Sequence, residues 1–307
     1  MPRISALERA RATHLGDVFT RREAETAGIS PAHLRSRSVH PVFRGVFTTA
    51  EYPTRLDIRT RAALKLAGPR ALVCETTALA LWGVELPDAR LADTVHLWLP
   101  AGASRPRLAG IRVHQNALTG PPTHITGPLY GASPPDCWLQ AAQHLTVHDL
   151  VVLADGLTRR RDPMIFADDL RTIVTTSTGR RGIQAARRAL DQMREGTDSP
   201  TETRLRLLLV DAGLPCPAVN HPLTRADGSI LFYLDMAYVE ARVAVEYDGA
   251  LHVGDTVRMQ RDQSRRRRIE DLGWRLLTAT AADLAAPADF LASVRTALTR
   301  TPTRPHH

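Results

Sequence analysis

Lysine is almost absent from this sequence of 307 residues, whose basic charge comes nearly entirely from arginine. Lys65 is the single lysine, so a lysine general base is excluded everywhere beyond that position. The formal net charge of +8 favours a polyanionic partner. Because arginine makes bidentate contacts with phosphate and with guanine edges, we expect that partner to be DNA.

Cysteine and long apolar runs are also scarce. Cys74, Cys137 and Cys216 are far apart and odd in number, which excludes a disulfide framework and gives no zinc-ligand spacing. We expect them to be reduced, buried thiols. Charges and prolines interrupt every apolar run, and residues 1–17 contain no continuous apolar segment of a secretory signal. The sequence therefore predicts a cytoplasmic protein with no membrane partner.

The succession of helical and strand patterns predicts a multidomain protein of the α+β or α/β class. A polar, turn-rich stretch at residues 194–200 marks the start of the last domain. The expected divisions are a winged helix-turn-helix at 1–52, a mixed middle α+β domain at 53–198, a C-terminal αβββαβα domain at 199–300 and a disordered basic tail at 301–307.

Two helix starts and a hairpin characterise the first expected domain. Thr20 and Glu23 form a capping box, and Ser30 with Pro31 opens a second helix. Two short strand patterns then surround a turn at Arg44 and Gly45. With a helix expected at residues 4–10, this is the order of a winged helix-turn-helix.

In that fold the basic residues of the second motif face DNA. We expect His33, Arg35 and Arg37 to lie on the recognition helix and to face a groove, with Arg44 at the wing tip. The alternative is a small helical domain whose basic face is simply solvated.

The middle segment shows regular elements but no chemistry. Helices are expected at 54–67, 75–82, 136–144, 148–157, 165–172 and 182–193, and strands at 95–100 and 111–116, with a loop rich in proline and glycine at 118–135. Its histidines lack the close spacing of a fixed ligand set and are expected to be structural or on the surface. They are His96, His114, His124, His144 and His148.

The C-terminal segment places several carboxylates on two neighbouring strands. Strand alternation at 230–238 puts Asp235 on the face opposite Met236, and at 242–248 it puts Glu246 and Asp248 on one face. Asp235 joins them across the ladder if the register permits. Converging carboxylates suit a hard divalent cation, which serves phosphodiester hydrolysis. The alternative is a hairpin whose carboxylates pair with nearby arginines.

Two flanking helices complete the expected site. Ser199 and Glu202 form a capping box, and Glu202 can also reach a metal ion beyond the helix start. His252 follows the second strand and can act as a general acid or base. The helix at 256–272 is rich in arginines, which either face solvent or hold a nucleic-acid backbone. They are Arg258, Arg261, Arg265, Arg266, Arg267 and Arg268.

The motif E…D…EYDGxxH…RDxxRRRR…GW, over residues 199–298, resembles the uncharacterised family related to very-short-patch-repair endonucleases, in the PD-(D/E)XK restriction-endonuclease-like superfamily. The resemblance implies a Mg²⁺ or Mn²⁺ site at Asp235 and Glu246, with Glu202 and His252 assisting. It also implies that Asp262 and Arg265 belong to the signature helix. The superfamily's lysine is replaced here by Asp248, so His252 would supply its function.

The sequence VFTRREAETAGISPAHLRSR with PVFRGVF, then TTALALWGV, resembles the AbiEi-like winged-helix antitoxin family of abortive-infection systems. This implies a DNA-binding, regulatory or antitoxin ancestry for the front of the chain. The leading hypothesis is a metal-dependent, endonuclease-like DNA-processing protein. The alternatives are a DNA-binding regulator or antitoxin with an inactive nuclease-like domain, and a scaffold that binds a toxin, repair or defence partner.

Overall fold

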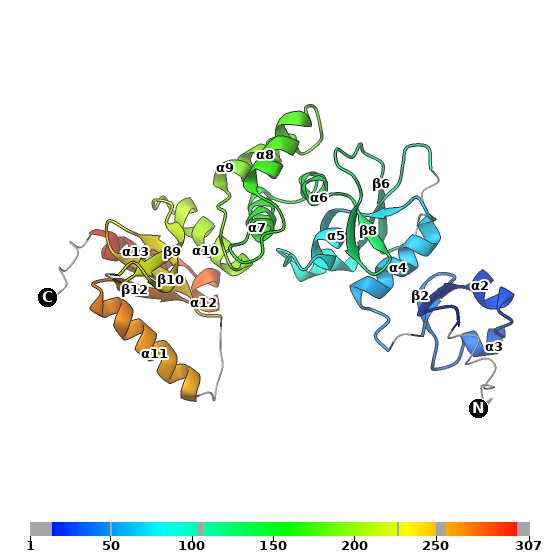
Figure 1. Ribbon diagram of the computed structural model, residues 1–307, viewed down its shortest axis with the longest axis horizontal. Helices are drawn as coiled ribbons and strands as arrows, with labels where there is room; N and C mark the ends of the chain where they lie inside the picture. The colour runs from blue at the N-terminus through cyan, green and yellow to red at the C-terminus, as the bar shows by residue number, and fades with distance from the viewer. Residues whose placement is uncertain are drawn as a thin grey trace. The chain divides into compact units, whose positions relative to one another are not determined.

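The computed structural model describes residues 14–49, 51–103, 107, 109–225, 227–249 and 256–299, with only the backbone described at 256–262. The described chain is a mixed α/β protein whose strands form three sheets (Figure 1). It divides into two compact units. The first takes the chain up to Leu150 together with Asp168–Arg188, and the second takes Val151–Ala167 together with the chain from Ala189 onward.

A small antiparallel sheet opens the first unit. Thr20 caps the first described helix, as expected, because its Oγ1 accepts from the Glu23 amide at 3.1 Å and Glu23 Oε2 accepts from the Thr20 amide at 2.7 Å. Ser30 caps the next helix through the His33 amide. The hairpin is confirmed, and a third strand that was not expected pairs with it in the order β1-β3-β2. The elements are β1 (Val18–Thr20), α2 (Arg21–Thr26), α3 (Pro31–Leu34), β2 (His40–Phe43) and β3 (Val46–Thr48).

The helix α4 (Leu56–Ala67) packs on this small sheet. Ile58 and Ala62 form a buried cluster with Val18 and Val46. The neighbouring residue Ala63 belongs to a second cluster with strands of the next sheet. The boundary expected at residue 52 therefore lies inside the first unit, because one helix supplies apolar side chains to both sheets.

The larger sheet of the first unit has five strands in the order β6-β5-β4-β8-β7. The pairs β5/β6 and β4/β8 are parallel, while β4/β5 and β7/β8 are antiparallel. Two of these strands lie in the segment 118–135 that was expected to be a loop. The elements are β4 (Leu72–Val73), α5 (Glu75–Leu81), η1 (Ala89–Asp93), β5 (Val95–Trp98), β6 (Ile111–His114), β7 (Thr123–Thr126), β8 (Leu129–Gly131) and α6 (Pro134–Ala141).

The helices expected after residue 136 are all present. The division between the two units falls within α7 and α9 and at the start of α8. The boundary expected at residue 198 thus differs from the division found, because parts of these helices cluster with the C-terminal elements. The helices are α7 (Val147–Leu157), α8 (Ala167–Thr176) and α9 (Ile183–Gln192).

From Pro200 onward, the second unit has the expected order αβββαβα with one additional short helix, α12. Its sheet has the order β12-β11-β10-β9, in which β11 and β12 are parallel and the other pairs are antiparallel. The elements are α10 (Pro200–Asp211), β9 (Ala218–Thr224), β10 (Ile230–Tyr238), β11 (Val243–Tyr247), α11 (Thr256–Asp271), β12 (Arg275–Ala279), α12 (Ala281–Ala285) and α13 (Ala288–Thr299).

Helices cover both faces of this sheet. On one face, side chains of α10 and α13 form a buried cluster with Val243 and Val245. On the other face, Ile269 of α11 packs with Leu234 and Ala244. The alternation within β11 is therefore as expected.

Strict alternation in β10 is not observed. Leu234 clusters with Ala237 on the α11 side, whereas Met236 belongs to the cluster on the opposite face. The expectation that Leu234 and Met236 share a face was wrong. The alternation of side chains between the two sheet faces is therefore interrupted around Asp235, a residue of the expected site.

The helices described in the two units include none with the length and apolar content needed to cross a membrane.

Candidate functional site

The strands β10 and β11 bring Asp235 and Glu246 close together. Their ladder pairs Met236 with Val245 and Ala237 with Ala244. The ladder ends at the first of these pairs, and Asp235 and Glu246 are the next residues of the two strands, close enough for the Glu246 charge to act on Asp235. The Tyr247 amide donates to Asp235 Oδ2 at 3.2 Å, which ties the Asp235 side chain to the end of β11.

The pKa of Asp235 reflects two other carboxylates, those of Glu202 and Glu246, close to its side chain. Burial, together with the neighbouring Glu202 and Glu246 carboxylates, raises the pKa of Asp235 to about 7. The Tyr247 amide and the Arg265 guanidinium oppose the shift. Like charges that share a partly buried site favour retention of a proton, and such perturbed acids are typical of functional sites.

Arg265 occupies both oxygens of Glu246. Its Nη1 lies 2.5 Å from Glu246 Oε2 and its Nη2 lies 2.6 Å from Oε1, a bidentate pair. The same Nη2 donates to the Tyr233 carbonyl at 2.9 Å, and the guanidinium lies 5.5 Å from the Phe232 ring centroid. A cation of the protein itself therefore already neutralises one of the two expected metal ligands.

The remaining expected members of the site are placed differently. Glu202 accepts from the Ser199 hydroxyl and from the Asp198 amide, so it serves as a helix-capping group, and burial raises its pKa. In a capping box the Glu202 carboxylate would accept from the Ser199 amide. It accepts from the Asp198 amide instead, so the expected capping box is only half formed. Asp248 is exposed, and its amide donates to Ala279. His252 and the side chains of Arg258, Arg261 and Asp262 lie outside the described residues.

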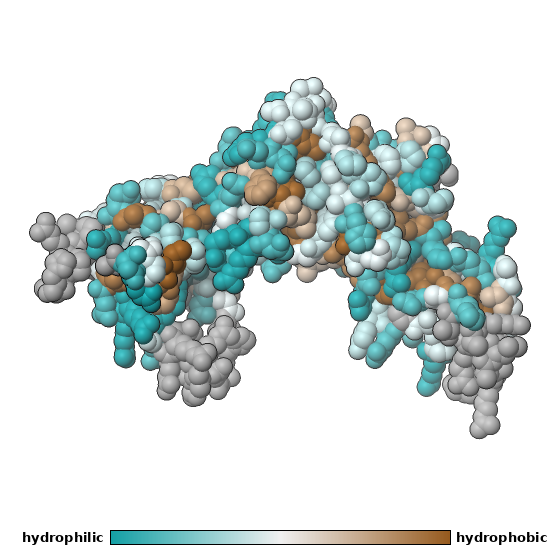
Figure 2. Space-filling model, viewed as in Figure 1, coloured by the Kyte–Doolittle hydropathy of each residue, from teal (hydrophilic) through white to brown (hydrophobic). Residues whose placement is uncertain are grey.

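The second half of α11 carries a basic surface. Arg266, Arg267 and Arg268 are exposed, while Ile269 on the same helix is buried. Figure 2 shows hydrophilic residues gathered over this part of α11. Arg265 differs from its neighbours because it turns toward Glu246.

The basic residues near the N-terminus do not share one helix face. The helix α3 ends at Leu34, so Arg35 is its C-cap and Arg37 lies beyond it. His33 is 4% exposed and belongs to the interior, which corrects the expectation that it faces a DNA groove. Arg35, Arg37 and Arg44 are exposed, the last at the turn of the hairpin.

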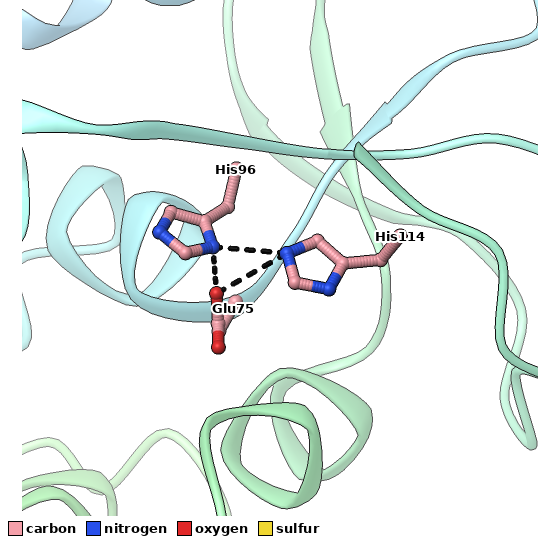
Figure 3. Close-up of side chains that lie close together, drawn as sticks. All are labelled: Glu75, His96 and His114. Carbon is pink, nitrogen blue, oxygen red and sulfur yellow. Dashed lines mark hydrogen bonds and ion pairs between the residues drawn. The ribbon is translucent and has the colours of Figure 1, made fainter. Parts of the chain in front are cut away.

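A second cluster of ionisable side chains was missed in the sequence. Glu75, the first residue of α5, points toward His96 of β5 and His114 of β6 (Figure 3). Glu75 is 2% exposed and His96 is 8% exposed. The backbone of Glu75 has φ +52°, a left-handed conformation that is strained for a residue with a side chain.

The donor atoms of this cluster converge. His96 Nδ1 lies 3.0 Å from His114 Nε2, and His114 Nε2 lies 3.3 Å from Glu75 Oε2. His96 Nδ1 also contacts Glu75 Oε2, and His144 Nε2 lies 3.8 Å from Glu75 Oε1. Among the described residues, Glu75, His96 and His114 are the group with the spacing of metal ligands, and the carboxylates of the second unit form no such group.

The imidazoles of His96 and His144 have lowered pKa values, which favours their neutral forms. Burial lowers the pKa of His96 to about 3, and the nearby His114, Arg112 and His144 act in the same direction. Burial also lowers the pKa of His144, assisted by Arg112 and His114. A neutral imidazole can accept or share a proton, and it is the form that binds metals.

Only the strand pairing reveals this cluster. His96 and His114 are far apart in sequence, and β5 and β6 pair in parallel with Trp98 opposite His114. The usable signal was the placement of one histidine in each of two strand patterns. Glu75 gave no signal, because an acidic residue at a helix start is ordinary.

Comparisons with known proteins give no function. No protein-family model matches the chain. Over 252 residues it is 27% identical to two uncharacterized proteins of Mycobacterium tuberculosis, MT2308 of strain CDC 1551 / Oshkosh and Rv2248 of strain H37Rv, covering 82% of this chain and 89% of each relative. The crystal structure of the RV2827C protein from Mycobacterium tuberculosis matches 73% of this chain and 86% of its own, with 16% identity and a TM-score of 0.42.

Proposed function

We propose that the second unit is a metal-dependent endonuclease that hydrolyses DNA phosphodiester bonds. The observation that carries the proposal is the state of Asp235, which burial and the Glu202 and Glu246 carboxylates bring to a pKa of about 7. A divalent cation would reduce the repulsion among these neighbouring carboxylates, because it stabilises their charged forms. The resemblance of this segment to nuclease families points in the same direction.

Each group in the proposed site has a separate role. Asp235 and Glu246 would hold Mg²⁺ or Mn²⁺, and Glu202 lies close enough to Asp235 to add to the negative field. The ion would supply neutralisation of the charge that develops on the phosphodiester. Arg266, Arg267 and Arg268 would hold the nucleic-acid backbone from α11. The role of His252 as acid or base stays a prediction from the sequence.

Replacing Asp235 with asparagine is the first test. We expect Mg²⁺- or Mn²⁺-dependent cutting of plasmid and mismatched duplex by the wild type, and a loss of about 10²–10³-fold in the variant, the effect of removing a group that stabilises transition-state charge. Gel assays with metal and with EDTA measure this. The matched control is Asp227→Asn, because Asp227 is an exposed acid in the same unit. Cutting that survives in Asp235→Asn would assign the activity to a contaminant or to another site.

The bidentate contact of Arg265 with Glu246 favours a second candidate function. In this alternative the protein is a DNA-binding regulator, of antitoxin-like ancestry, whose nuclease-like unit does not cut because an arginine takes the place of the cation. It predicts salt-sensitive DNA binding by the wild type and by Asp235→Asn, with no cutting by either. The variant Arg265→Gln adds a direct readout. If this variant binds Mg²⁺ or Mn²⁺ and the wild type does not, Arg265 is the group that prevents metal binding.

The first unit would bind duplex DNA through its exposed arginines in both candidate functions. We expect the double variant Arg35→Ala and Arg37→Ala to bind short duplexes more weakly at every sequence. The slope of log K against log salt should fall by about 2, one for each lost phosphate contact. Fluorescence anisotropy across a salt series measures it. The double variant Arg90→Ala and Arg107→Ala removes the same charge from exposed positions of the same unit and serves as the control. Equal slopes for the two variants would contradict the assignment of Arg35 and Arg37.

A further inference from the structure

We propose that Glu75, His96 and His114 form a Zn²⁺ site in the first unit. The site is independent of the proposed nuclease function, because none of its residues belongs to the second unit. The inference rests on where the backbone places the three side chains, on the distances among their donor atoms and on the chemistry of those donors.

The backbone around the three residues is fixed by hydrogen bonds. The Cys74 amide donates to the His96 carbonyl at 3.1 Å, so α5 begins directly beside β5. The His96 amide donates to Thr77 Oγ1 of α5 at 2.9 Å. The Leu99 amide donates to the His114 carbonyl at 2.9 Å, which extends the pairing of β5 and β6. Sites built on such regular elements hold their ligands in place before a metal arrives.

The distances suit a tetrahedral ion. Zinc ligands lie about 2.0–2.1 Å from the metal, so two nitrogen or oxygen ligands in a tetrahedron lie about 3.3 Å apart. The structure has 3.0 Å between His96 Nδ1 and His114 Nε2, and 3.3 Å between His114 Nε2 and Glu75 Oε2. All three ligand atoms lie within 4.8 Å of one another. His96 Nδ1 and Glu75 Oε2 are in direct contact, so these two side chains must separate by rotation to seat an ion between them.

The donor set selects a transition metal. Two imidazole nitrogens and one carboxylate oxygen suit Zn²⁺, whereas Mg²⁺ and Ca²⁺ require oxygen ligands. The His144 side chain is 35% exposed and stands 3.8 Å from the other oxygen of Glu75. The cluster therefore offers three protein ligands beside the partly exposed His144 side chain, and one water molecule would complete a four-coordinate site.

A bound cation also accounts for the burial of Glu75. The side chain is 2% exposed, and within the described part of the chain its ion pairs are all with histidines. A buried carboxylate without a permanent cation is costly. Zinc would supply that charge at the point where the donor atoms meet.

Metal content of the full-length protein tests the site. After incubation with Zn²⁺ and exhaustive dialysis, we expect elemental mass spectrometry to find about one zinc ion per chain. Glu75→Gln and His114→Asn should each retain less than about a tenth of this, because three ligands define the site. The matched control is His124→Asn, since His124 is an exposed histidine of the same unit. Asp235→Asn and Cys216→Ser should retain the ion, which separates this site from the proposed nuclease and from the exposed thiol.

Cobalt gives a readout that does not depend on the variants folding. Wild-type protein loaded with Co²⁺ should show the intense visible absorption of a four-coordinate ion, and Zn²⁺ should displace it. Circular dichroism establishes whether each variant is folded. A folded wild type that retains no zinc, a weak six-coordinate cobalt spectrum, or full zinc retention by folded Glu75→Gln would each overturn the proposal.

Discussion

Replacing Arg206 with methionine is expected to lower the free energy of unfolding of the second unit by about 3–5 kcal/mol, the cost of leaving a buried ion without its partner. Arg206 is 1% exposed and Asp155 is 0% exposed. Arg206 Nη2 donates to Asp155 Oδ2 at 2.8 Å, and Arg206 Nη1 donates to the Gln192 carbonyl at 2.8 Å. Methionine keeps much of the apolar length but none of these bonds.

The partner of Arg206 is satisfied from several directions. Asp155 Oδ2 also accepts from Thr203 Oγ1 at 2.9 Å, and Oδ1 accepts from the Arg194 amide at 2.8 Å. Burial raises the pKa of Asp155, and Arg206 with these donors acts against that rise. Removal of Arg206 therefore leaves Asp155 to lose its charge or to remain buried and unpaired, and both outcomes destabilise the fold.

Urea unfolding followed by circular dichroism measures this loss. The matched control is Arg204→Met, because Arg204 is exposed on the same helix; we expect it to stay within about 0.5 kcal/mol of the wild type. The double variant Arg206→Met and Asp155→Leu should recover much of the stability, since apolar residues of similar size can replace a buried pair. A similar small loss for Arg206→Met and Arg204→Met would show that the buried pair contributes little.

Local signals in this sequence predict the elements well. The caps at Thr20, Ser30 and Ser199 are each set by residues within one helical turn, and each is formed in the structure. The strand β10 spans the residues expected for it. Failures appear where short elements carry weak patterns, as in β7 and β8, whose turn-rich sequence resembles a loop.

The candidate sites depend on contacts that no local pattern contains. The facing of Asp235 could not be predicted, because β10 departs from strict alternation at that residue. Arg35 and Arg37 were assigned to α3 by extending the helix past Leu34, where it ends, whereas His33 lies within α3 on its buried side. The cluster of Glu75, His96 and His114 required knowledge of which strands pair, and the buried pair of Asp155 and Arg206 joins two distant helices. Such pairings follow from the global fold.

Asp235→Asn is expected to stabilise the second unit at alkaline pH while it removes the proposed activity. Asp235 has a pKa of about 7 in the folded protein, raised first by burial and then by Glu202 and Glu246. An aspartate in an unfolded chain has a pKa of about 3.9. Between these values the folded state holds a proton that the unfolded state has released, so stability falls as the pH rises from about 4 to about 7.

The size of the effect follows from the shift. A rise of about 3 pH units in the pKa corresponds to about 4 kcal/mol, and partial exposure of the side chain reduces this to about 2–3 kcal/mol. Asparagine carries no charge and keeps an oxygen that can accept from the Tyr247 amide. In EDTA at pH 8, Asp235→Asn should therefore be more stable than the wild type by about 2–3 kcal/mol, and at pH 4 the two should be nearly equal.

Urea midpoints of the wild type and the variant at pH 4 and pH 8 measure the difference, and the comparison cancels the titration of groups that do not interact with Asp235. Glu240→Gln, at an exposed position between β10 and β11, should change stability by less than about 0.5 kcal/mol at either pH. Added Mg²⁺ or Mn²⁺ should reverse the order at pH 8, because an ion that binds the folded wild type stabilises it and the variant has lost a ligand. An advantage of the variant that is equal at both pH values would mean that packing, and not the crowding of carboxylates, sets the energetics of this position.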